Sequence, residues 1–126
     1  MSKKILIVED NEKNMKLVRD ILAFQGYEVL EAVTGEQGVA LALSEAPDLI
    51  LMDIQLPDIS GVTALQRIRE DKSLDAVPVL AVSASVMPDE QQRIVTSGFD
   101  AFIAKPLSLK PFLATVNEAL VSGRKS

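Results

Sequence analysis

Three acids, a hydroxyl and a lysine each stand at the end of a short apolar run. They are Glu9 and Asp10 after KILIV, Asp53 in LILMD, Ser83 in VPVLAVS, and Lys105 in AFIAK. Each has a plain structural explanation by itself, because acids favour helix N-termini and most lysines are simply solvated. If the fold brings the three carboxylates together, however, they repel one another, so that either one of them needs a raised pKa or all need a cation.

The expected cation is Mg²⁺, for which Mn²⁺ could substitute. The chain has no histidine and no cysteine, and a site with oxygen ligands alone favours a hard ion. Magnesium held by a few carboxylates keeps positions open for water and for a phosphate oxygen, and Lys105 and Ser83 are suited to bind phosphoryl oxygens. The set therefore predicts phosphoryl transfer, with Asp53 as the nucleophile that forms an aspartyl phosphate.

The elements that must position these residues alternate along the chain. Short apolar runs, read as strands, cover residues 4–8, 28–32, 49–53, 77–83 and 101–105. The first, third and fourth runs are nearly continuous in apolar residues, as in strands covered on both faces. Segments with helical spacing cover residues 12–25, 35–46, 62–70, 84–98 and 108–122.

Each helical segment carries an expected inward stripe. The stripes are Leu17, Val18, Ile21 and Leu22; Val39, Ala42 and Leu43; Val62, Leu65 and Ile68; Ile94 and Val95; and Leu109, Phe112, Leu113, Val116 and Leu120. Asn11 and Ser108 are expected N-caps, and Thr34 with Gln37 three positions on matches a capping box.

Five alternations of strand and helix predict an α/β fold with a doubly wound parallel sheet and helices on both faces. In such sheets ligands bind beyond the carboxyl ends of the strands, near the switch in strand order. The acids, the hydroxyl and the lysine all stand at that edge, so the fold prediction and the chemical prediction agree.

The composition excludes several classes of protein. The 126 residues hold no Pro/Ser-rich linker, so we expect one domain over 1–126 with no output domain. The apolar runs are too short for a signal peptide or for the roughly 20 residues of a membrane helix. A net charge of −5 disfavours nucleic-acid binding. Without cysteines the chain suits a reducing compartment, and we expect a cytoplasmic protein without membrane insertion.

Four sequence pieces carry a resemblance to a known family: ILIVEDN, LILMDIQLPDISG, VLAVSAS and AFIAKP. In this order and at these separations, the chain resembles the receiver domain of two-component response regulators from end to end. EDNEKNM followed by LILMDIQLPDISG is most similar to single-domain, DivK-type regulators of bacterial cell division and polarity. The resemblance implies a flavodoxin-like (CheY-like) sheet of order 2-1-3-4-5 with five helices.

The resemblance also implies a role for each residue of the set. Asp53 would be the phosphoacceptor. Asp10 would bind Mg²⁺ directly, together with Asp53 and the backbone carbonyl of Gln55, and Glu9 would act through water. Ser83 would hydrogen-bond a phosphoryl oxygen, and Lys105 would form a salt bridge to the same group. The family would make this a signalling protein that catalyses its own phosphorylation and dephosphorylation.

Further residues are implied by the same resemblance. Ala84 would guard access to Asp53. Gln55 and Ser85 would tune the lifetime of the phosphoryl group. Ser83 and Phe102 would form the switch, and Lys105–Pro106 would be a cis peptide. On periodicity alone, Phe102 reads as an ordinary core residue.

The partners follow from the family and from the missing histidine. A histidine kinase or a histidine phosphotransferase must supply the phosphoryl group. A downstream protein would bind the face formed by helix 84–98, strand 101–105 and helix 108–122. The chain itself would be a monomer or weak dimer. Its partners would recruit it to a cell pole. Helix 84–98 offers only Ile94 and Val95 as inward contacts, which suits a two-state element.

Three alternatives stay open at this point. The chain could be a receiver excised from a hybrid histidine kinase. It could be a small phosphatase with an aspartyl intermediate, although Gln55 stands where such enzymes often carry a second acid. It could also bind a nucleotide or flavin, although it lacks a Gly-rich phosphate loop after the first strand.

Overall fold

A parallel β-sheet runs through the middle of the computed structural model, which describes residues 3–84 and 87–123. Within these residues the sheet has five strands in the order β2-β1-β3-β4-β5, so the predicted fold class and strand order are confirmed. The strands are β1 (Lys4–Val8), β2 (Glu28–Ala32), β3 (Leu49–Asp53), β4 (Val79–Ser83) and β5 (Ala101–Ala104). The helices are α1 (Glu12–Phe24), α2 (Gly35–Glu45), α3 (Gly61–Arg69), α4 (Pro88–Thr96) and α5 (Leu109–Ser122), with a short 3₁₀ helix η1 at Lys72–Leu74.

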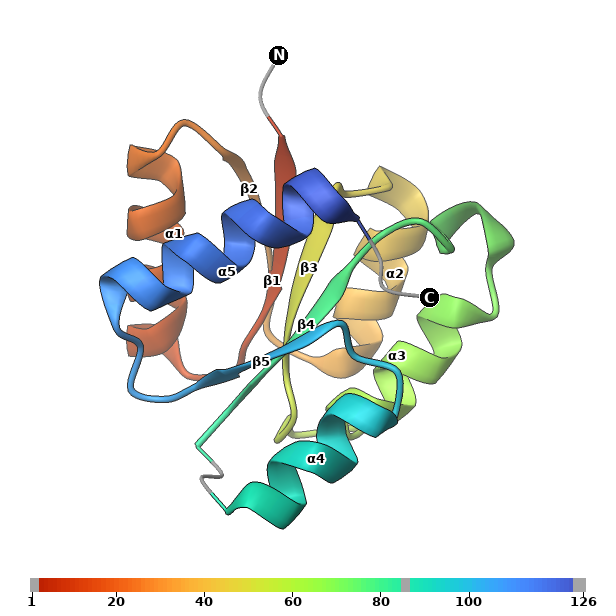
Figure 1. Ribbon diagram of the computed structural model, residues 1–126. Coiled ribbons are helices and arrows are strands. Elements are labelled where there is room, and N and C mark those ends of the chain that lie inside the picture. Colours follow the sequence, from red (N-terminus) through yellow and green to blue (C-terminus); the bar gives the residue numbers. More distant parts are fainter. Residues whose placement is uncertain (1–2, 85–86, 124–126) are drawn as a thin grey trace.

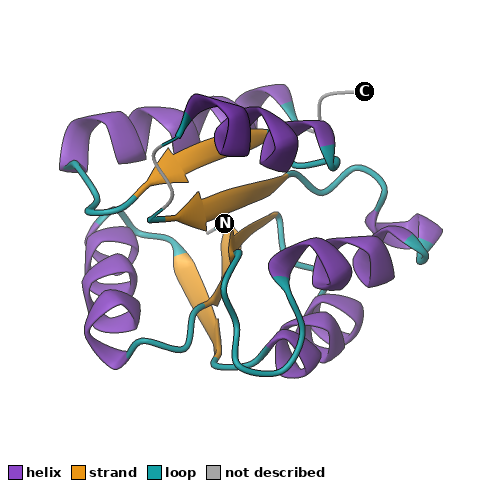
Figure 2. Ribbon diagram, turned by 90° about the horizontal axis from the view of Figure 1, so that it is seen from below, coloured by secondary structure: helices purple, strands orange, loops and turns teal. Residues whose placement is uncertain are grey.

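Helices cover both faces of the sheet (Figure 1). One core packs alternate strand residues such as Ile5 and Leu51 against α1 and α5. The other packs the intervening residues, such as Leu6 and Ile50, against α2 and α3. Figure 2 shows the strands in the middle of the molecule with helices around them. Because successive side chains of a strand point to opposite faces, burial on both faces explains the nearly continuous apolar runs.

The direction of winding changes between β1 and β3. From β1 the chain passes through α1 to β2 on one side, and then through α2 to β3 on the other side of β1. All four strand pairings are parallel. The loops after β1 and β3 therefore diverge, and a crevice opens at the carboxyl ends of these two central strands.

The inward stripes are narrower than the sequence predicts. Leu17, Leu43 and Leu109 are 46%, 47% and 54% exposed. In α1 the fully buried positions are Met15, Val18 and Leu22, which repeat at intervals of three and four residues. A helix packed on a sheet buries the row of residues that faces the sheet, and residues to the side of this row face water.

The helix caps follow the prediction in part. Asn11 accepts a hydrogen bond at 3.0 Å from the N–H three residues on, and Thr34 accepts one at 3.0 Å from the N–H of Gln37. The Gln37 side chain accepts from the N–H of Val33 at 2.9 Å, one residue before the position that a capping box uses. Ser108 occupies the N-cap position of α5 without a side-chain cap bond.

Helix α4 is the most loosely packed helix among the described residues. It begins at Pro88 without a side-chain cap, and none of its residues is fully buried. Ile94 packs against the core beneath it, whereas Val95 is exposed, so the prediction that both face inward is wrong for Val95. None of the helices in the described part of the chain is long and apolar enough to cross a membrane.

A buried ion pair ties the amino-terminal edge of the sheet to α3. One Asp100 carboxylate oxygen accepts from the N–H of Val79 at 2.9 Å and lies 3.4 Å from a guanidinium nitrogen of Arg69. Arg69 also donates to the carbonyl of Leu74 at 2.8 Å. This network fixes the start of β4 and β5 at the edge opposite to the acids.

Asp100→Ala should lower the free energy of unfolding by about 3 kcal/mol, because it leaves the largely buried Arg69 charge without this carboxylate. Urea denaturation at neutral pH measures the loss. Glu31→Ala is the control: it breaks the exposed Arg19–Glu31 pair and should cost under about 1 kcal/mol. Equal losses in the two variants would contradict a structural role for Asp100.

Candidate functional site

Two carboxylates are buried at the carboxyl ends of the central strands. Asp53 is the last residue of β3 and Glu9 directly follows β1, and each is only 4% exposed. Asp10, one residue later, is exposed. One carboxylate oxygen from each of the three acids lies within 4.8 Å of the others. The structure thus brings together the three acids that the sequence placed at one edge.

Lys105 joins the two buried acids. Its Nζ lies 2.9 Å from Oε1 of Glu9 and 2.9 Å from Oδ2 of Asp53. Its backbone N–H donates to the carbonyl of Ser83 at 2.9 Å, which continues the pairing of β4 with β5 by one residue. The side chain therefore reaches from the edge strand to the centre of the sheet. The Lys105–Pro106 peptide bond is cis, the geometry that the resemblance implies.

Backbone N–H groups hold the remaining oxygens of both buried acids. The N–H of Gln55 donates to Oδ1 of Asp53 at 3.0 Å, and the N–H of Asn11 donates to Oε2 of Glu9 at 3.1 Å. Each carboxylate is thus held on one side by the lysine and on the other by its own loop. Their orientation is set before any ligand arrives.

Burial and neighbouring charges shift the pKa values of Glu9 and Lys105. Burial raises the pKa of the Glu9 carboxyl and the adjacent Asp53 carboxyl raises it further, against the opposing effects of Lys105 and the Asn11 N–H. Burial alone would lower the pKa of Lys105, but the contacts with Glu9 and Asp53 outweigh it, and the pKa is raised. Lys105 is therefore charged at neutral pH, and its one positive charge lies between the two buried acids Glu9 and Asp53.

The donor set fits a divalent hard cation. Glu9, Asp10 and Asp53 supply carboxylate oxygens close enough to share one ion, and Mg²⁺ prefers oxygen ligands while keeping several waters. The site opens to solvent through a cleft lined by Glu9, Asp10, Asn11, Glu12, Asn14, Asp53, Gln55, Leu56, Pro57, Ala84 and Lys105. A phosphate-bearing partner could reach Asp53 by this route.

The hydroxyl and the small residue lie beside the acids. Ser83 is buried at the end of β4, whose residue Val82 pairs with Asp53. Ala84 is exposed and lines the cleft. Ser85 lies outside the described residues. The roles of Ser83 and Ala84 towards a phosphoryl group stay predictions.

Phe102 is half-buried on the edge strand β5. It packs against the core on the side of α2 and α3 and also lines a hollow with Thr115 and Glu118 of α5. It is therefore neither a fully buried core residue nor a solvated one. Its role as a switch residue stays a prediction.

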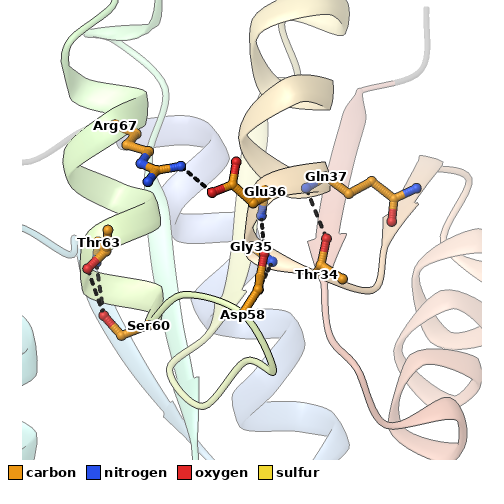
Figure 3. Close-up of polar contacts among 8 residues, drawn as sticks. All are labelled: Thr34, Gly35, Glu36, Gln37, Asp58, Ser60, Thr63 and Arg67. Atoms are coloured by element: carbon orange, nitrogen blue, oxygen red, sulfur yellow. Dashed lines mark hydrogen bonds and ion pairs between the residues drawn. The ribbon is translucent and has the colours of Figure 1, made fainter.

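The loop after Asp53 contains an acid, Asp58, for which the sequence analysis predicted no role. Asp58 accepts hydrogen bonds from the N–H groups of Gly35 and Glu36 at 2.8 and 2.9 Å, at the start of α2 (Figure 3). These bonds, chiefly the one from Glu36, lower the pKa of Asp58 from its ordinary 3.8 to about 2. Its partners lie more than twenty residues earlier in the chain, so no local sequence pattern predicts the contact.

The base of this loop is closed by Gly61. Its N–H donates to the carbonyl of Ile54 at 2.9 Å. A Cβ at this position would lie 2.5 Å from the backbone oxygen of Asp53, closer than packing allows. Ser60 then caps α3 by accepting from the N–H of Thr63 at 3.1 Å. Glycine at position 61 is thus required for α3 to begin directly against the strand that carries Asp53.

Comparison with known proteins assigns the family. The profile described as response regulator receiver domain matches residues 5–117. The chain belongs to the response regulator receiver family. It is 43% identical over 120 residues to the polar-differentiation response regulator DivK of Brucella ovis and of Brucella abortus, which covers 95% of this chain and 98% of those proteins.

Solved structures agree with the family. This receiver domain superposes with a TM-score of 0.87 on a CheY-like receiver protein from Methanospirillum hungatei, at 30% identity over 97% of this chain and 96% of that one. It superposes with a TM-score of 0.89 on the receiver domain of the sensor histidine kinase PA1611 from Pseudomonas aeruginosa, at 28% identity over 96% and 99% of the two chains. That structure has a magnesium ion coordinated in its active-site cleft.

Lys105→Met should lower the free energy of unfolding by about 3 kcal/mol at neutral pH, because two buried acids lose their counter-charge. The loss should shrink towards mildly acidic pH, where Glu9, with its raised pKa, can take up a proton. Urea denaturation across this pH range, without divalent cations, measures both effects. Lys110→Met, at an exposed position of α5, is the control, and a loss as small as in this control would contradict the ion-pair assignment.

The contribution of Asp58 to stability should depend on pH. Because its pKa is lower in the folded protein than its ordinary 3.8, its stabilising effect is complete above about pH 4 and is lost as the pH falls towards 2. Wild type should exceed Asp58→Asn in stability at neutral pH, and the difference should vanish in this acidic range. Denaturation curves of both proteins from neutral to acidic pH test this, and a difference that stays constant would refute it.

Proposed function

We propose that this receiver domain accepts a phosphoryl group on Asp53 and signals by binding a partner protein according to its phosphorylation state. The observation that supports this most strongly is the geometry around Asp53. Its carboxylate is buried, is held by Lys105 and the Gln55 N–H, and stands in a three-acid cluster that opens to solvent.

Magnesium would be held by Asp10, Asp53 and the backbone carbonyl of Gln55, with Glu9 acting through water. When bound, Mg²⁺ supplies positive charge that offsets the charge of the transferring group. The oxygen-only donor set and the magnesium-containing PA1611 receiver support this choice. Mn²⁺, with the same preference for oxygen, would substitute.

The residues of this chain would divide the phosphoryl transfer among them. An Asp53 oxygen attacks phosphorus, the bond from phosphorus to the donor breaks, and the donor keeps the electron pair. Lys105, now 2.9 Å from Asp53, would move its contact to a phosphoryl oxygen. The Ser83 hydroxyl would donate to another oxygen. Water would later hydrolyse the acyl phosphate, at a rate tuned by Ala84, Gln55 and Ser85.

The donor must lie on another protein if it is a phosphohistidine, because this chain has no histidine. A histidine kinase or a histidine phosphotransferase fills this role. The protein is then a signalling protein that promotes its own phosphorylation and dephosphorylation.

The output would be a change in the face formed by α4, β5 and α5. Phosphorylation adds charge and acceptor oxygens next to Ser83, and Phe102 would turn inward as Ser83 is drawn to the phosphoryl group. The loosely packed α4, with no fully buried residue, and the half-buried Phe102 support this. A downstream protein would recognise the changed face, with the receiver itself a monomer or weak dimer.

The DivK relatives support a single-domain regulator of cell polarity, recruited to a cell pole by its partners, because the alignment covers 98% of their length. The similarity to the PA1611 receiver supports a second candidate, a receiver that works within a hybrid histidine kinase. Membership of the receiver family disfavours a phosphatase or a nucleotide-binding module, and Gln55 supplies no second acid for the former.

Intact mass after incubation with acetyl phosphate and Mg²⁺ tests the proposal. Wild type should gain one labile phosphoryl group, and Asp53→Asn should gain none. Asp20→Asn, an exposed acid on α1, should behave as wild type, and omission of Mg²⁺ should abolish the gain. If neither acetyl phosphate nor a phosphorylated histidine phosphotransferase modifies the folded protein, the proposed phosphoacceptor is wrong.

A further inference from the structure

The tip of the β3–α3 loop is clamped onto the start of α2. Both oxygens of Asp58 are engaged, one by the N–H of Gly35 at 2.8 Å and the other by the N–H of Glu36 at 2.9 Å. These are charge-assisted bonds to the positive end of a helix. The next residue, Ile59, lies so close over Gly35 that a Cβ there would be 2.4 Å from its side chain. Polar and apolar contacts thus fix the same point.

A second link joins the two helices beside the clamp. Arg67 of α3 forms an ion pair with Glu36 of α2 (Figure 3). Both side chains are largely exposed, so this pair contributes little by itself. The Asp58 bonds therefore carry most of the polar attachment between the loop and α2.

The clamp leaves little freedom to the segment that borders the metal site. At the base of the loop, the N–H of Gln55 is bound to Asp53, and the N–H of Gly61 is bound to Ile54. At the tip, Asp58 is bound to α2. Gln55 at the base and Pro57 next to the tip both line the cleft around Asp53.

We propose that Asp58 is a positioning residue for the Asp53 site: by clamping the loop onto α2, it holds the Gln55 backbone in place and so sets the affinity of the site for Mg²⁺. The identity of the ion rests on the proposed function. Groups hydrogen-bonded directly to metal ligands commonly change metal affinity by 10–100-fold when they are removed. Asp58 acts on Gln55 from three residues further along the loop, so we expect an effect at the lower end of this range.

Asp71 provides a matched control. Like Asp58, it is an acid that binds an N–H group at the start of a helix. As the N-cap of η1, its carboxylate accepts from the N–H and hydroxyl of Ser73 at 2.9 and 2.6 Å. It precedes β4 and therefore lies at the opposite edge of the sheet. Asp71→Ala should lose a comparable cap without touching the loop after Asp53.

Magnesium titration of the full chain by calorimetry tests the proposal. Asp58→Ala should weaken Mg²⁺ binding by on the order of tenfold, Asp58→Asn, which keeps an oxygen acceptor, should weaken it less, and Asp71→Ala should match wild type. Thermal unfolding checks that each variant is folded. Unchanged affinity in Asp58→Ala would overturn the inference, while absence of Mg²⁺ binding in wild type would overturn the proposed function.

Amide hydrogen exchange without Mg²⁺ gives a readout that does not depend on the metal. The N–H groups of Gln55 and Gly61, at the base of the loop, should exchange faster in Asp58→Ala and at the wild-type rate in Asp71→Ala. Unchanged exchange rates at both positions would show that the Asp58 bonds do not restrict motion at the base of the loop. The inference would then fail regardless of the measured Mg²⁺ affinity.

Discussion

The mutual repulsion of three carboxylates at the end of two central strands is the constraint on which the rest of the site depends. Glu9 and Asp53 are almost fully buried, and burial of two like charges is unfavourable unless an opposite charge lies between them. Lys105 meets this need, with one amino group 2.9 Å from each acid. Lys105 carries one positive charge beside two buried acids, and the adjacent Asp10 adds a third carboxylate, so the cluster suits the proposed cation.

The parallel sheet satisfies this constraint because its interior is rigid and its edge is open. The strands β1 and β3 have a hydrogen-bonded strand on each side and helices on both faces. The backbone that carries Glu9 and Asp53 therefore cannot shift. The loops beyond them are fixed by backbone bonds, by the close approach of Gly61 and by the clamp at Asp58. The result is a buried carboxylate of set orientation that lines a cleft open to solvent, as the proposed in-line attack would require.

The opposite half of the edge is built differently. Helix α4 has no fully buried residue and no side-chain cap, and Phe102 on the adjacent strand is only half-buried. Under the proposed function, a site that holds its geometry and a surface that changes are thus separated in one small domain, with β4 and its terminal Ser83 between them. Rigid packing suits the chemistry, and weak packing suits a change of state at low cost in free energy.

The sequence by itself determined the fold class, the strand order through the family resemblance, and the edge at which the acids gather, because alternation of strand and helix leaves few topologies. It also indicated the caps at Asn11 and Thr34, which depend on residues within one turn. Only the tertiary structure decided which helix residues are buried, and Leu17 shows why: exposure depends on how a helix rests on the sheet.

At the site, too, the sequence did not reveal the contacts that depend on tertiary packing. The sequence predicted the three acids and the lysine as a set, since all end strands of one sheet. It could not show that Glu9 pairs directly with Lys105, or that Asp58 binds the N-terminus of α2, because each partner lies far away along the chain. Local patterns predict local contacts, and contacts between distant segments exist only once the chain has folded.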